Sequence, residues 1–125
     1  MAMILTDLQA TFIHYLAPGW TDPDGEVYPH GGTQEVGQLA EADGLEFLCP
    51  KCYVANGGEV GTHRVICWFV CKVPDDVRPG PGRWTPQGTG LNDLSFVPSE
   101  GRSHSVLLTG GGCAWHGFVT DGKAE

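Results

Sequence analysis

Apolar runs along the chain predict short strands separated by loops. The clearest run covers residues 63–73 (HRVICWFVCKV), and because polar residues hardly interrupt it, we expect a central strand covered on both faces. Shorter runs at residues 45–49, 94–99, 104–108 and 114–119 also predict strands, since each is rich in apolar side chains and lies near turn-forming residues. These patterns favour a mainly β structure.

Two segments nearer the N-terminus fit more than one pattern. Residues 4–16 (ILTDLQATFIHYL) could form a helical stripe, but their β-branched and aromatic side chains favour a strand. Residues 33–44 predict a short helix with its N-cap at Thr33. Residues 17–32 and 74–90 are dense in proline, glycine and aspartate, and they predict loops.

Composition supports this picture and bounds its size. A chain of 125 residues predicts one domain, residues 1–125, with a modest core. Nineteen glycines and nine prolines favour many turns over long helices. The expected fold is mainly β, with a small α+β fold as the alternative. We expect a single compact domain of short antiparallel strands and loops rich in glycine and proline.

Two short motifs carry the candidate chemistry. In Cys49-Pro-Lys-Cys52 and in Cys113-Ala-Trp-His116, two metal donors lie three positions apart. That spacing lets a tight turn aim both donors at one ion, and two such turns supply three thiolates and one imidazole, a common structural zinc set. We therefore expect a zinc-ribbon-like Zn²⁺ site held by Cys49, Cys52, Cys113 and His116, with the domain organised around it.

A CxxC pair alone is also compatible with a redox couple or with two buried thiols. A redox couple needs a helix that begins at the pair and lowers the thiol pKa. The adjacent glycines that follow Cys52, in YVANGGEVG, do not favour such a helix. The presence of both pairs favours a shared metal site. Cys67 and Cys71, in the apolar run, are expected to pack in the core as small hydrophobic side chains.

Two histidines keep a second arrangement open. His63 and His104 each precede an apolar run, so either could replace a proposed ligand or lie beside the metal as a proton carrier. The simpler interpretation places both at strand edges as ordinary polar residues. No catalytic residue is assigned, because the sequence contains no HExxH, P-loop, zinc-deaminase or nucleophile-elbow motif.

Charge and hydropathy limit the kinds of partner and the cellular location that we expect for this chain. The net charge is −8, and the seven basic residues are scattered singly, which argues against a basic face for nucleic acid. The acidic balance suits solubility or a basic protein partner. No apolar run is long enough to span a membrane, and the N-terminus lacks the basic region of a signal peptide. We therefore expect a cytoplasmic protein with reduced cysteines.

Several segments resemble those of one known group of proteins. FLCPKC, THRVICWF, GPGRWTPQGTGLNDLSFVPS and GGGCAWHGFVTDGK are similar to segments of small, uncharacterised phage and prophage proteins described as metal-binding. With LTDLQATFIHYL and LAEADG, the resemblance covers most of the chain. It implies a phage setting and a metal held by Cys49, Cys52, Cys113 and His116, and it implies no reaction. In looser relatives the last Cys and His can be adjacent, whereas two residues separate them here.

Two functional hypotheses follow. The first is a phage-encoded zinc-binding protein with a structural Cys3His site. It would act by binding another protein, a host factor or a virion component, in the cytoplasm of the infected bacterium or in the virion. The second is a zinc-dependent hydrolase-type enzyme, with three protein ligands, a metal-bound water, and His63 or His104 near the open position.

Overall fold

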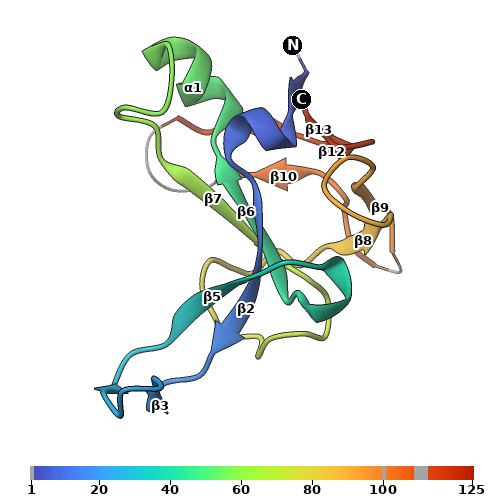
Figure 1. Cartoon of the computed structure of the whole chain (residues 1–125). Helices are drawn as coiled ribbons and strands as arrows, with labels where there is room; N and C mark the ends of the chain where they lie inside the picture. Colours follow the sequence, from blue (N-terminus) through green and yellow to red (C-terminus); the bar gives the residue numbers. More distant parts are fainter. Residues whose placement is uncertain (1, 100, 109–112) are drawn as a thin grey trace.

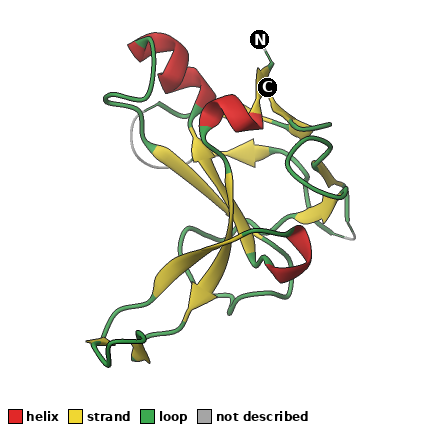
Figure 2. Cartoon of the chain, viewed as in Figure 1, coloured by secondary structure: helices red, strands yellow, loops and turns green. Residues whose placement is uncertain are grey.

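The computed structural model describes residues 2–99, 101–108 and 113–125. In this part of the chain the fold is mainly β, with several small antiparallel sheets and one short α-helix (Figure 1 and Figure 2). None of the described helices has the length and apolar character that crossing a membrane requires. The helices are the 3₁₀ turns η1 (Leu5–Leu8) and η2 (Leu39–Glu41) and the α-helix α1 (Pro50–Asn56). The strands are β1 (Met3–Ile4), β2 (Thr11–Leu16), β3 (Trp20–Thr21), β4 (Val27–Tyr28), β5 (Gly32–Val36), β6 (Gly44–Leu48), β7 (Arg64–Trp68), β8 (Thr85–Gln87), β9 (Ser95–Val97), β10 (Val106–Leu107), β11 (His116–Gly117), β12 (Val119–Thr120) and β13 (Lys123–Ala124).

A four-stranded antiparallel sheet, in the order β5-β2-β6-β7, is the largest sheet in the described structure. Between β6 and β7, Leu45 lies opposite Cys67 and Phe47 lies opposite Val65. All four side chains are buried, because alternate positions of a strand point to the same face. The sheet thus presents one apolar face to the rest of the chain.

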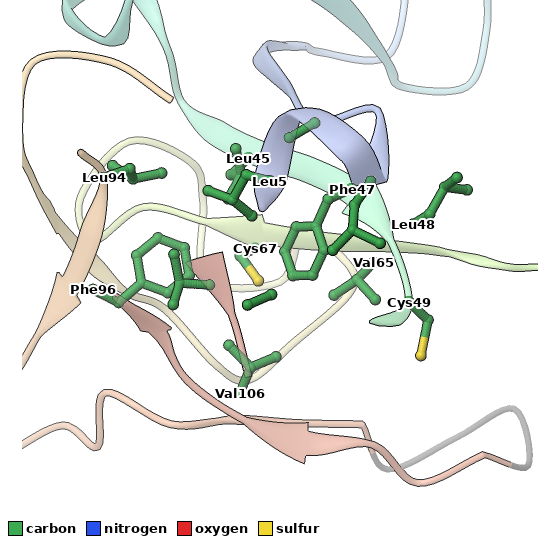
Figure 3. Close-up of a cluster of buried hydrophobic side chains, with 14 of the residues drawn as sticks. Leu5, Leu45, Phe47, Leu48, Cys49, Val65, Cys67, Leu94, Phe96 and Val106 are labelled. Atoms are coloured by element: carbon green, nitrogen blue, oxygen red, sulfur yellow. The ribbon is translucent and has the colours of Figure 1, made fainter. Parts of the chain in front are cut away.

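The main core lies against that face and gathers side chains from both ends of the sequence. Figure 3 shows Leu5 from η1, Phe96 from β9 and Val106 from β10 around the β6 and β7 side chains, and all of them belong to one buried cluster. The N-terminal β1 pairs with β13, which in turn pairs with β12, so the chain ends form their own three-stranded sheet. Both ends of the chain are therefore fixed close to the core.

The predicted helix over residues 33–44 is wrong. Its first part is β5, which pairs with β2 over five positions from Phe12 opposite Val36 to Leu16 opposite Gly32. Only the single turn η2 is helical, and it has no side-chain N-cap. Gly37 lowers the helix propensity of the segment, and pairing with β2 stabilises the extended alternative.

The strand predicted over residues 63–73 is present but shorter, and its position differs. It ends at Trp68, and it lies at the edge of the four-stranded sheet rather than at the centre. Phe69 forms a single bridge to Trp84, and Cys71 has a left-handed backbone with φ of 64°. The prediction that Cys67 packs in the core is confirmed, whereas Cys71 is exposed, because the strand has ended before it.

The other strand predictions hold in shortened form. The run at residues 45–49 is β6, the C-terminal half of residues 4–16 is β2, and the runs at residues 94–99 and 104–108 contain β9 and β10. The run at residues 114–119 is instead divided between β11 and β12, which belong to different sheets. Residues 109–112, the glycine-rich stretch before Cys113, lie outside the described residues. The mainly β fold class is therefore confirmed.

Truncation of a core side chain on β6 tests how much the packing of this sheet contributes to the free energy of unfolding. We expect Leu45→Ala to lower the free energy of unfolding by about 2–5 kcal/mol, because the Leu45 side chain is fully buried and its loss leaves a cavity. Val60→Ala is the control, since Val60 is exposed and should change stability by less than about 0.5 kcal/mol. Urea unfolding followed by tryptophan fluorescence measures both, and equal stabilities would contradict the assignment of this core.

Candidate metal centre

Three cysteines and one histidine converge at the end of the main core. The donor atoms of Cys49, Cys52, His63 and Cys113 all lie within 4.8 Å of one another, which makes this a group able to hold a metal ion. Cys49 is fully buried and the other three are partly buried. Figure 3 shows Cys49 at the margin of the apolar cluster, where β6 ends.

The β6–β7 ladder brings Cys49 and His63 together. Cys49 directly follows β6, His63 directly precedes β7, and the Cys49 backbone N–H donates to the His63 carbonyl at 2.9 Å. This bond continues the register in which Leu48 lies opposite Arg64. Two donors that are distant in sequence therefore lie side by side because the strands pair.

Helix α1 begins at Cys49 and orients Cys52. Cys49 is the N-cap and Pro50 occupies the first turn, where its fixed φ suits a helix and its missing N–H costs no hydrogen bond. The expectation that the following glycines prevent a helix here is wrong. Gly57 instead ends α1 after seven residues, with a left-handed φ of 69° that accepts glycine readily.

Cys113 comes from the other end of the chain and is held by its neighbours. The Lys51 ammonium donates to the Cys113 carbonyl oxygen at 2.7 Å. Two residues further on, the buried Trp115 ring packs edge-on against Phe47, with ring centroids 5.9 Å apart, and its carbonyl accepts from the Leu108 N–H. These contacts dock the C-terminal segment beside the Cys49–Cys52 turn.

The structure does not bring His116 into this group. Ala114 has a left-handed φ of 50°, Trp115 then points into the core, and His116 is exposed in β11 opposite Leu107. Because side chains alternate along a strand, burying Trp115 turns His116 outward. The fourth donor in the structure is His63, which the sequence marked only as a possible replacement. Its position at the start of the strand that pairs with β6 is the signal that identifies it.

The spacing of the donors matches a small tetrahedral ion. Zinc bonds of about 2.3 Å to sulfur and about 2.0 Å to nitrogen imply sulfur–sulfur separations of about 3.8 Å and sulfur–nitrogen separations of about 3.5 Å in a tetrahedron. The Cys49 and Cys113 sulfurs are 3.6 Å apart, and the His63 Nε2 atom is 3.0 Å from the Cys113 sulfur. The first separation is close to the tetrahedral value, and the second is shorter than it.

The pKa values of the three thiols in the group are shifted in different directions. Burial raises the pKa of Cys49 to about 12 and also raises the pKa of Cys52. Burial opposes ionisation of Cys113 too, but hydrogen bonds from the Trp115 backbone N–H, from His63 and from the other two thiols outweigh it and lower its pKa to about 7. Cys113 is therefore the thiol of the group that ionises most readily, and a bound cation would favour ionisation of the other two.

The remaining candidates for chemistry lie elsewhere. The His104 ring packs against Phe118, with centroids 5.0 Å apart, and it is not part of the donor group. Trp68 belongs to a second, smaller apolar cluster, whereas Trp115 packs against the main core beside Cys113. Trp115 therefore links the donor group to the main core.

Comparisons with known proteins add no family to this picture. No protein-family model, no curated protein and no solved structure matches the chain.

The acidity of Cys113 can be measured in metal-free protein. We expect iodoacetamide to modify Cys113 at a rate that is half-maximal near pH 7 and levels off about 1–2 pH units higher, because only the thiolate reacts and its pKa is about 7. Cys49, with its pKa raised to about 12, should stay unmodified over that range. Mass spectrometry of peptides measures both rates, with buried Cys67 as the unreactive reference. Equal rates at Cys49 and Cys113 would contradict this geometry.

Proposed function

We propose that the protein binds one Zn²⁺ ion through Cys49, Cys52, His63 and Cys113, and that this ion has a structural role. The observation that carries the proposal is the convergence of four donors from two distant parts of the chain within 4.8 Å. Three thiolates and one imidazole form a ligand set that zinc prefers, because thiolates select zinc over the hard cations magnesium and calcium.

A structural role fits this set better than a catalytic one. Four protein donors fill a tetrahedron, whereas a hydrolytic zinc keeps one position for water. His63, a candidate proton carrier in the enzyme hypothesis, supplies the fourth donor instead. His104 packs against Phe118 rather than beside the donors. Neither histidine therefore supports a hydrolase.

We further propose that the protein is phage-encoded and acts by binding another protein in the infected cell or in the virion. The support for a phage setting is the resemblance of the segments that contain FLCPKC and GGGCAWH to phage proteins described as metal-binding. The support for an interaction role is a donor set that leaves the metal no reactive position. The ion would then hold the C-terminal segment to the β6–β7 hairpin and so fix the surface that a partner meets.

Metal content separates His63 from His116 as the fourth ligand. We expect purified protein to contain one zinc per chain, and His63→Ala and Cys113→Ser to lose most of it. His116→Ala is the matched control and should keep its zinc, because His116 is exposed on β11 and lies outside the donor group. Inductively coupled plasma mass spectrometry measures zinc per chain. Zinc retained in His63→Ala but lost in His116→Ala would reverse the assignment.

Removal of the metal tests the structural role. Chelation should lower the free energy of unfolding by several kcal/mol, since a ligand present at 100 times its Kd stabilises the folded state by about 2.7 kcal/mol and structural zinc binds far more tightly. Cys71→Ser, a change at an exposed thiol, should show the same loss as wild type. Thermal unfolding with and without chelator measures the effect. If chelation removes the zinc and thermal unfolding is unchanged, the ion does not have a structural role.

A further inference from the structure

A groove of about 620 Å³ opens beside the metal centre. One wall is the start of β7, including His63; the second is the loop at residues 79–84; and the third is the segment at residues 102–108. This volume lies in the range of binding sites for small molecules and short peptide segments. Apolar side chains such as Trp84 and Leu107 line much of the groove, and Leu107 is 54% exposed.

One side of the groove is an unpaired strand edge. The Cys49 N–H donates to the His63 carbonyl, and the Phe69 N–H donates to the Asp43 carbonyl, so the odd-numbered residues of β7 direct their backbone groups to β6. The even-numbered residues Arg64 and Ile66 direct theirs away from β6, because antiparallel strands alternate in this way. Within the described residues, no hydrogen bond is made to the backbone N–H or carbonyl groups of Arg64 and Ile66.

That edge is free only over part of its length. Further along it, the Trp84 N–H donates to the Trp68 carbonyl and the Val70 N–H donates to the Trp84 carbonyl. The backbone of Trp84 thus already occupies one end of the edge. The remaining stretch, at Arg64 and Ile66, has the geometry at which an extended peptide adds to a sheet.

The groove is positively charged although the protein is acidic. Arg64, Arg83 and Arg102 line it, and no aspartate or glutamate does so among the described residues. Arg64 is paired with Glu46, so its charge is partly neutralised. Arg83 and Arg102 form no ion pair with a carboxylate in the described part of the chain.

Arg83 is the more informative of the two unpaired arginines. Its side chain is only 5% exposed, and its terminal nitrogens donate to carbonyl oxygens of residues 74–82, including that of Val77 at 2.9 Å. Its Nε–H has no acceptor among the described residues. Carbonyls hold this guanidinium in place but do not cancel its charge, so a buried positive charge lies beside the groove.

We propose that this groove binds an extended acidic segment of a partner protein, which pairs with the free edge of β7 at Arg64 and Ile66. The unpaired backbone groups would fix the strand, and Arg83 and Arg102 would attract its carboxylates. The inference rests on the proposed interaction role and names the class of partner. The metal supports the site, because His63 is both a donor and part of the groove wall.

A set of short synthetic peptides tests the proposal on the zinc-loaded chain. An alternating valine–glutamate peptide should bind in calorimetry, and its valine–lysine counterpart should not. N-methylation of the backbone nitrogens that face β7 should abolish binding, because it removes the strand hydrogen bonds and keeps the charge. Amide exchange by NMR should slow at Arg64 and Ile66 on binding and stay unchanged at Val65, whose backbone groups already face β6.

Charge variants locate the contact. Arg102→Glu should weaken the valine–glutamate peptide roughly fivefold, whereas Lys72→Glu, the same charge change at an exposed residue that does not line the groove, should have little effect. Equal binding of the acidic and basic peptides, or undiminished binding of the N-methylated peptide, would overturn the proposal. Binding of acetate alone with no binding of the peptide would also overturn it, in favour of a site for a small anion.

Zinc measured in the same samples keeps the two proposals separate. A chain that holds zinc but binds no acidic peptide contradicts the groove and leaves the metal site intact. A purified chain that contains no zinc but still binds the peptide at Arg64 and Ile66 contradicts the metal site and leaves the groove intact. His63→Ala is not a groove control, because His63 belongs to both structures.

Discussion

The antiparallel ladder between β6 and β7 is the interaction on which the other features depend. It buries Phe47 and Val65 in the main core, and its last hydrogen bond sets Cys49 beside His63. On the opposite edge of β7, no described residue pairs with Arg64 or Ile66. A shift of one residue in this register would turn the apolar side chains of β7 toward solvent and move His63 away from Cys49.

The donor group and the apolar core stabilise each other through the C-terminal segment. Cys113 lies 64 positions after Cys49, and the entropy of closing so long a loop rises only slowly with its length. Trp115 contributes by packing against Phe47, which brings Cys113 near the other sulfurs before any ion binds. The same contact explains the outward position of His116, since one residue of an alternating pair is buried at the cost of exposing the next. Core packing therefore places Cys113 in the donor group and keeps His116 outside it.

Much of this arrangement could be predicted from the sequence, and the errors have physical causes. Continuous apolar runs identified β6 and β7, and the Cys pair with Cys113 identified three donors of the group. His63 was only an alternative ligand in the sequence, because its place beside Cys49 depends on pairing between β6 and β7, which local spacing does not encode. The helix at Cys49 was missed for a different reason: the glycines that follow it end the helix rather than prevent it. The wrong prediction at residues 33–44 also results from strand pairing. These residues carry helix start and stop residues, but pairing with β2 makes their first part a strand.

The charge of the groove also differs from the net charge of the whole chain. A net charge of −8 suggests a basic partner, yet the groove beside the donor group is lined by three arginines and by no described carboxylate. The field at a binding surface depends on the nearest charges, because ions in solution screen those more than about 8–10 Å away. The excess of carboxylates elsewhere then disfavours nonspecific attraction of acidic chains. A segment that also pairs with β7 would gain backbone hydrogen bonds that a free anion cannot make, and under the proposed role this difference would select a strand-forming acidic partner.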